Sequence, residues 1–332
     1  MTDRPVMHDR LGRVVDDLRV SVTDLCNLRC QYCMPAEGVA WLPREEILSF
    51  EEITRLVGVF VGLGVDAVRL TGGEPLVRRG FPDLARSIGG VPGIEDLSVT
   101  TNGLLLERDA EGLADAGIHR FNVSLDAIDP ERYEQVTRRR GVDRVLAGLR
   151  LLLGLPGVRR VKVNAVSIRG ITDHEVPALV ALAQEFDIEV RFIEQMPLGA
   201  GAVWARERML SGAEVREMVE AVHPLTPRGR EPHATATVFD LTSAPGRIAF
   251  INPVSQPFCE DCNRIRLTAD GHLRTCLFGH RETDLRGPMR AGASDAEIGA
   301  IIRDAVWDKE RGHLMDSAAF RSPERTMSQI GG

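Results

Sequence analysis

The stretch Cys26-Asn27-Leu28-Arg29-Cys30-Gln31-Tyr32-Cys33 directly follows the alternating apolar run from Leu18 to Val22. Alternation of this kind is typical of a strand, so the C-x3-C-x2-C spacing predicts three thiolates converging at a strand end. A [4Fe-4S] cluster normally takes one cysteine on each of its four irons, so three cysteines would leave one iron open for chemistry. A structural zinc site would need a fourth Cys or His, and none lies nearby.

Strand and helix patterns alternate on both sides of this octapeptide. Strands are expected at 18–22, 67–71, 97–101, 121–124, 161–166 and 190–193, with helices at 81–87, 107–116, 143–153 and 176–186. The capping box of Ser49 and Glu52 begins a further helix, in which Ile53, Leu56 and Phe60 form an apolar face. Six β-α units predict a parallel sheet, either open and doubly wound or curved into an incomplete (βα)8-type barrel, with active residues at the carboxyl ends of its strands.

This alternation also divides the chain. Residues 1–17 are polar and are expected to form an N-terminal arm, and residues 18–196 form the α/β domain. The Pro/Gly-rich segment that starts at Pro197 opens a smaller C-terminal cap, residues 197–332. Within the cap we expect a helix at 213–222 and a β-hairpin built from 235–241 and 247–251.

Composition limits the possible functions. The chain has 332 residues and a net charge of -7, which argues against nucleic-acid binding. It contains no apolar run long enough for a membrane span and no signal-peptide core, so we expect a cytoplasmic protein without a membrane partner. Its six cysteines fall into two tight triplets, which metal clusters in a reducing compartment explain better than disulfides.

The second triplet is Cys259, Cys262 and Cys276, with the spacing C-x2-C-x13-C. By itself this pattern leaves two readings open, because C-x2-C is a common half-site for zinc and His272 or His280 could complete it. Taken together with the first triplet, a second [4Fe-4S] cluster is the more economical interpretation, again with one iron free.

Four basic residues interrupt strands that are otherwise apolar: Arg19, Arg69, Lys162 and Arg191. Each of them alone could be a solvated side chain or an ion-pair partner. Several pointing into one barrel would require anions, because buried cations are costly without them. This pattern suggests a polyanionic small substrate such as a triphosphate.

The first octapeptide, with an aromatic residue before its last cysteine, resembles the signature of the radical S-adenosylmethionine (SAM) enzymes. In Thr71-Gly72-Gly73-Glu74-Pro75, the paired glycines let the backbone approach a ligand closely and are expected to leave N–H groups free to bind it. This sequence resembles the motif with which that family holds the methionyl amino group of SAM. The resemblance implies an incomplete (βα)6 TIM-like barrel and a cluster on Cys26, Cys30 and Cys33 whose open iron binds SAM. It further implies SAM contacts from Tyr32, Gly73, Ser124 and Met196.

Within that superfamily, the run Phe258 to Arg266, the sequence Cys276-Leu277-Phe278-Gly279 and the end Ile330-Gly331-Gly332 resemble the GTP-cyclising enzymes of molybdenum cofactor biosynthesis. The resemblance covers the whole chain and implies conversion of GTP to (8S)-3′,8-cyclo-7,8-dihydroguanosine 5′-triphosphate. It implies a second [4Fe-4S] cluster on Cys259, Cys262 and Cys276, and a tail in which Gly331 and Gly332 enter the active site. The implied GTP contacts are Arg19, Arg69, Thr100, Lys162, Arg264 and Arg266.

The same resemblance implies an electron donor, a downstream cyclic pyranopterin monophosphate synthase and a possible homodimer as partners. The alternative function is that of another radical SAM enzyme with an auxiliary cluster, acting on a peptide. That alternative predicts additional cap cysteines to close the auxiliary cluster, and the sequence has none.

Overall fold

The computed structural model describes residues 5–198, 204–315, 317 and 320–331. Its first six strands are parallel and pair in chain order. They are β1 (Asp17–Ser21), β2 (Ala67–Thr71), β3 (Asp96–Thr101), β4 (Arg120–Ser124), β5 (Arg160–Ser167) and β6 (Glu189–Glu194). Each differs from the expected range by at most one residue at either end. The predicted α/β class and parallel sheet are therefore confirmed.

Helices separate these strands: α1 (Phe50–Gly62), α2 (Phe81–Gly89), α3 (Leu106–Asp115), α4 (Pro130–Thr137), α5 (Val142–Gly154) and α6 (Thr172–Phe186). The capping box of Ser49 and Glu52 begins α1 as predicted. The sequence did not predict α4, which is short and is capped by the Asp129 side chain. None of the helices in the described ranges is long and apolar enough to cross a lipid bilayer.

The C-terminal third contributes ten further elements. They are α7 (Gly212–Glu220), β7 (Leu225–Gly229), β8 (Thr237–Leu241), β9 (Arg247–Ile251), β10 (Arg264–Leu267), β11 (His272–Arg274), β12 (Thr283–Asp284), α8 (Arg286–Arg290), α9 (Asp295–Trp307) and α10 (Met327–Ile330). Short 3-10 helices are η1 (Arg44–Glu46), η2 (Pro75–Val77) and η3 (Arg206–Arg208). The antiparallel pair β8 and β9 is the expected hairpin.

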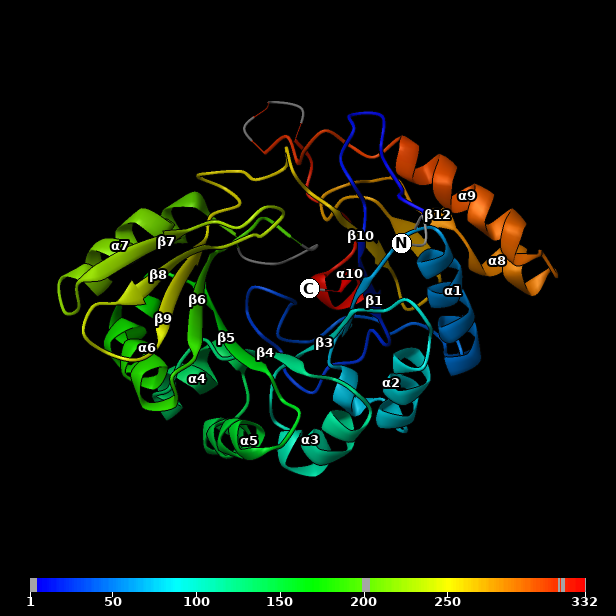
Figure 1. Cartoon of the computed structure of the whole chain (residues 1–332). Coiled ribbons are helices and arrows are strands. Elements are labelled where there is room, and N and C mark those ends of the chain that lie inside the picture. The colour runs from blue at the N-terminus through cyan, green and yellow to red at the C-terminus, as the bar shows by residue number, and fades with distance from the viewer. Residues whose placement is uncertain (1–4, 199–203, 316, 318–319, 332) are drawn as a thin grey trace.

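Strands from this third complete the central sheet instead of forming a separate layer. Its strand order is β12-β11-β10-β1-β2-β3-β4-β5-β6-β9-β8-β7. β10 pairs in parallel with β1 and β9 in parallel with β6, so eight parallel strands lie side by side. Figure 1 shows this sheet curving into an arc, with α2, α3, α5 and α6 along its outside and α10 inside.

Register across the sheet aligns three arginines. Leu18 and Val20 of β1 are fully buried, and Arg19 between them points to the opposite face. Arg19 lies opposite Arg69 on β2 and opposite Arg266 on β10. Like charges directly opposite each other destabilise a sheet, so this row requires a compensating anion.

Candidate active site

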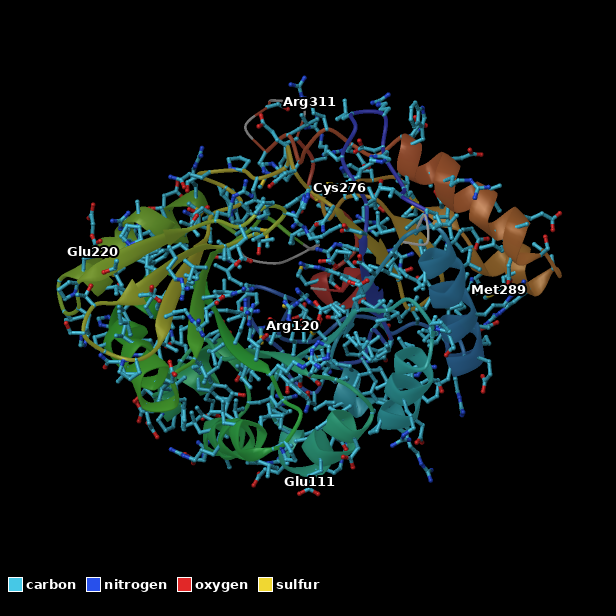
Figure 2. The ribbon with its side chains drawn as sticks, in the orientation of Figure 1. Glu111, Arg120, Glu220, Cys276, Met289 and Arg311 are labelled. Carbon is cyan, nitrogen blue, oxygen red and sulfur yellow. The ribbon has the colours of Figure 1, made fainter. Side chains whose placement is uncertain are left out.

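The two cysteine triplets open into one cavity of about 330 Å³ inside the arc. Most of the residues predicted from the sequence line this cavity: Arg19, Tyr32, Arg69, Gly73, Thr100, Ser124, Met196, Arg264, Arg266 and all six cysteines. Figure 2 shows Cys276 on the inner side of the arc, whereas Glu111 and Glu220 lie on the outer helices. A larger groove of about 890 Å³ lies on the outer surface between α1 and α9, and no cysteine lines it.

The loop that carries the first triplet is held from two directions by hydrogen bonds to its backbone. Gly73 N–H donates to the Thr23 carbonyl and Glu74 N–H to the Leu25 carbonyl, both at 2.8 Å. From the other side, the Arg138 guanidinium at the end of α4 donates to the carbonyls of Arg29 (2.9 Å) and Met34 (3.0 Å). The unpredicted helix α4 therefore positions the cluster loop.

These contacts correct the role that the sequence suggested for the paired glycines. We expected their N–H groups to be free for a ligand, but that of Gly73 is used within the protein. A Cβ at Gly73 would lie 2.3 Å from the Leu25 carbonyl oxygen and 2.4 Å from that of Asp24. Glycine is required here because the cysteine loop packs directly on the backbone.

Tyr32 connects the cysteine loop to the central sheet. Its hydroxyl donates to Asp126 Oδ2 at 2.8 Å, while Asp126 Oδ1 accepts from Val166 N–H at 2.8 Å. Burial raises the pKa of Asp126 to about 6, although both hydrogen bonds oppose the shift. Sequence reasoning placed Tyr32 at the site by its position between cysteines but did not identify Asp126 as its partner.

All three cysteines of the first triplet are free, and Cys26 and Cys30 pack against the apolar core. Burial raises the pKa of Cys26 to about 11, and burial followed by repulsion from neighbouring cysteines raises the pKa values of Cys30 and Cys33 well above their usual range. Cluster binding replaces these protons with iron. Three free thiols lining a shared cavity fit a cluster held by three cysteines.

Around the second triplet the charge is different. Burial opposes ionisation of Cys262, but the cations Arg264 and Lys309 outweigh it and lower the pKa of this thiol to about 7. Arg13, from the N-terminal segment, donates to the Cys259 carbonyl at 2.8 Å. Burial raises the pKa of the other two thiols, Cys259 and Cys276, despite the opposing charge of Lys309. Cluster binding would replace the protons of these two thiols with iron, as at the first triplet.

The structure describes other partners for the histidines of the zinc alternative. His272 lies 3.2 Å from Asp270, and His280 contacts the Arg321 carbonyl at 3.2 Å. Within the described ranges, no three His, Cys, Asp or Glu side chains converge on a position for a single metal ion.

Between the two triplets lies the row of arginines. Burial, and then repulsion from Arg69 and Arg266, holds the pKa of Arg19 well below its usual range. Arg19 Nε has no hydrogen-bond partner among the described residues, and Arg69 Nε reaches only Ser98 Oγ at 3.4 Å. Guanidiniums in this arrangement are suited to hold a ligand with several negative charges.

Lys162 differs from the other predicted contacts, because it is not among the residues that line the cavity. Its ammonium is buried and lies 3.0 Å from Glu189 Oε1, which also pairs with Arg191 at 2.5 Å. Burial and then repulsion from Arg191 lower the pKa of Lys162 to about 7. Arg191 does line the cavity, so β6 presents a cation where the sequence suggested Lys162 on β5.

The C-terminal tail lies inside the arc (Figure 1), where Met327 and Ser328 line the cavity. Arg266 Nη1 donates to the Gly331 carbonyl. Gly331 has φ +83°, and a Cβ on it would lie 2.1 Å from Ser21 Oγ. A side chain is therefore excluded at Gly331. Gly332, also predicted to act in the site, lies outside the described residues.

Comparison with known proteins agrees with this architecture. Residues 20–183 match the model of the radical SAM superfamily, and residues 188–315 match that of Molybdenum Cofactor Synthesis C. A GTP 3′,8-cyclase of Rhodopirellula baltica is 47% identical, across 100% of this chain and 94% of that relative. A GTP 3′,8-cyclase of Streptomyces coelicolor is 44% identical across 98% of this chain and 96% of that relative.

Among solved structures, SuiB of Streptococcus suis bound to S-adenosylmethionine has a TM-score of 0.60. The match covers 96% of this chain and 78% of that one at 14% identity, so it supports the fold alone. The two family matches and the near-full-length relatives are decisive for the assignment. This chain belongs to the radical SAM superfamily and, within it, to the GTP 3′,8-cyclase family.

Proposed function

We propose that this chain converts GTP to (8S)-3′,8-cyclo-7,8-dihydroguanosine 5′-triphosphate, the first step of molybdenum cofactor biosynthesis. The cofactors are SAM and two [4Fe-4S] clusters, held by Cys26, Cys30 and Cys33 and by Cys259, Cys262 and Cys276. When bound, SAM and the first cluster supply a 5′-deoxyadenosyl radical that takes the C3′ hydrogen of GTP, after which C3′ bonds to C8 and one electron and one proton complete the product.

One observation carries the proposal: Arg19, Arg69 and Arg266 form an adjacent row in a cavity shared by both triplets. None of the hydrogen bonds described for these three guanidiniums goes to a carboxylate. A triphosphate supplies the missing negative charge. With Arg264 and Thr100, this row would fix the nucleotide between the two clusters, and orientation is the main contribution that a protein makes to such a reaction.

Tyr32, Gly73, Ser124 and Met196 are the proposed SAM-contacting residues. Gly73 would contribute to SAM binding indirectly, because its contacts hold the cysteine loop against the end of β2. Lys162 would act indirectly, because it pairs with Glu189, which also pairs with the cavity-lining Arg191. The proposed domains remain an arm of residues 1–17, a barrel of 18–196 and a C-terminal part of 197–332.

Three partners complete the proposal. A low-potential electron donor must deliver electrons to the first cluster, because cleavage of SAM consumes one. Cyclic pyranopterin monophosphate synthase would take the product as the next enzyme of the pathway. A homodimer is the proposed assembly state.

Anaerobic incubation of the reconstituted protein with SAM, a reductant and GTP tests the activity. We expect the cyclised nucleotide by mass spectrometry, 5′-deoxyadenosine in equal amount, and about eight irons per chain with negligible zinc. Two zinc ions and no iron would refute the proposal.

A substitution tests the substrate site separately. Arg266→Ala should weaken GTP binding about tenfold or more, because charge-assisted hydrogen bonds contribute roughly 1.5–3 kcal/mol. Cleavage of SAM should survive, since the hydrogen bond described for Arg266 goes to the tail and not to the loop of the first triplet. Unchanged GTP affinity in calorimetry would contradict the assignment, and Arg303→Ala, an exposed change on α9, is the control.

A further inference from the structure

Lysine is almost absent from this chain. Of its 41 basic residues only Lys162 and Lys309 are lysines, and both are buried. A lysine ammonium is a compact point charge, whereas a guanidinium is a wide planar fork. The two lysines therefore occupy positions where a small buried cation fits. Lys162 has a carboxylate partner, Glu189, at 3.0 Å.

Lys309 is 1% exposed and bonds to carbonyls alone. Its Nζ donates to the Arg264 carbonyl at 2.8 Å and to the Thr275 carbonyl. Within the described part of the chain it forms no ion pair with an Asp or Glu. A buried cation without an anion is costly, so a negative group nearby must balance it.

The two acceptors of Lys309 belong to opposite halves of the second triplet. Arg264 follows Cys262 by two residues, and Thr275 immediately precedes Cys276. The ammonium therefore ties the C-x2-C half to the remote cysteine. Lys309 also interacts electrostatically with all three members, Cys259, Cys262 and Cys276.

Arg13, in the N-terminal segment, also connects parts of the chain around the second triplet. It donates to the carbonyl of Cys259 (2.8 Å) and also to those of Glu310 (2.7 Å) and Arg311 (3.2 Å). The segment 309–311 is thus fastened to Cys259 by Arg13 and to the flanks of Cys262 and Cys276 by Lys309. Figure 2 shows Arg311 at the outer edge of the molecule and Cys276 nearer its middle.

We propose that Lys309 is the positioning residue and fixed counter-charge of the second cluster. It holds the two halves of the triplet at one spacing and balances the negative charge of three thiolates on a [4Fe-4S] core. Reduction adds one electron from the donor and one more negative charge to the cluster. A buried ammonium favours that reduced state, so Lys309 raises the reduction potential.

The proposal rests on the assignment of the second cluster to Cys259, Cys262 and Cys276, and the experiment separates the two. The background is the full chain with Cys26, Cys30 and Cys33 replaced by Ala, so that only the second cluster can form. Iron content after anaerobic reconstitution and the midpoint potential from an EPR-monitored titration are measured. Absence of iron from this background would overturn the cluster assignment and, with it, the role of Lys309.

In the triple cysteine-to-alanine variant, Lys309→Met should lower the equilibrium constant for one-electron reduction of the second cluster about tenfold. This corresponds to a shift of its midpoint potential by about 59 mV to a more negative value. Arg281→Met is the matched control, because Arg281 pairs with Asp308 beside Lys309 but is exposed. If the Met variant fails to fold by circular dichroism, Lys309→Gln removes the charge and keeps a hydrogen-bond donor. An unchanged potential in a folded neutral variant, or an equal shift in the Arg281 control, would overturn the proposal.

Discussion

Arg325 Nη2 lies 2.9 Å from Asp270 Oδ2, and this ion pair joins the C-terminal tail to the turn between β10 and β11. The same guanidinium reaches Glu282 Oε2 at 2.7 Å. Arg325 precedes the capping box of Thr326 that begins α10, and α10 delivers Gly331 to Arg266. The position of the tail therefore depends on a pair of carboxylates outside the cavity.

Arg325→Ala should release the tail. Loss of charge-assisted hydrogen bonds to two partly buried carboxylates is expected to lower the stability by about 2 kcal/mol. Amide hydrogen exchange of residues 326–331 should accelerate about tenfold or more, while exchange in α1 stays unchanged. Arg321→Ala, an exposed change in the same tail, is the control. Equal protection of α10 in both variants would show that the pair does not hold the tail.

Gly331→Ala should abolish cyclisation while both clusters remain. The new Cβ would lie 2.1 Å from Ser21 Oγ and 3.1 Å from Thr71 Cγ2, so the tail must move. A displacement of about 1 Å in an active site costs on the order of a hundredfold in rate. Product formation and iron content are the measurements.

Gly157→Ala provides the matched control for that change. Gly157 also has a positive φ, +87°, but a Cβ on it meets nothing within 4 Å. It therefore carries the same backbone strain without the collision. Full cyclisation by the Gly331 variant, or equal loss in both variants, would refute the steric role of the tail glycine.

Gly73→Ala should remove the first cluster selectively. The added Cβ meets the carbonyl oxygens of Leu25 and Asp24 at 2.3 and 2.4 Å, and backbone cannot yield as a flexible side chain can. We expect iron to fall from about eight to about four per chain, with GTP binding retained. Gly58→Ala, in α1 with open space around it, should keep both clusters. Retention of about eight irons by the Gly73 variant would contradict the packing argument.

Asp126→Asn should change how the stability of the apoprotein depends on pH. The folded-state pKa of Asp126 is about 6, above its unfolded value of 3.8, so the folded state binds an extra proton between these two values. The contribution of this group to stability is therefore fully present below the unfolded pKa of 3.8, falls as pH rises from there, and is lost above about pH 6. Linkage gives about 1 kcal/mol more stability at about pH 5 than at about pH 7 from this group.

Urea denaturation of the wild-type and Asp126→Asn apoproteins at the two pH values measures this difference. The variant should lose the contribution, because an amide does not titrate. Tyr32→Phe is the companion change, since it removes a hydrogen bond that opposes the shift. An identical pH dependence in the variant and in the wild type would exclude Asp126 as its source.

Local sequence patterns were sufficient to predict much of this fold. β2 has the expected bounds, and the Ser49 capping box begins α1, because both elements are specified by neighbours in sequence. β10 was not predicted, since a four-residue strand with two arginines has little intrinsic signal. Its conformation comes from pairing with β1, at the other end of the chain.

The residues of the site also divide into those that local sequence predicts and those that it does not. The six cysteines and the arginines on strands could be found from spacing and from charge in apolar runs. Lys309 could not, because its role depends on carbonyls that are 45 and 34 residues away. The Gly73 N–H was misassigned because sequence shows that a glycine permits close approach but not which group approaches it.

The parallel pairing of β9 with β6 and of β10 with β1 also has a consequence during synthesis. As the chain leaves the ribosome, β1 to β6 emerge first, and the outer edges of β1 and β6 have no pairing partner. The edge of β6 remains unpaired until β9, which begins at Arg247, has been made, and the edge of β1 until β10, which begins at Arg264. Unpaired edge strands can pair with other chains. Nascent protein should therefore depend on chaperone shielding until its final third has been translated.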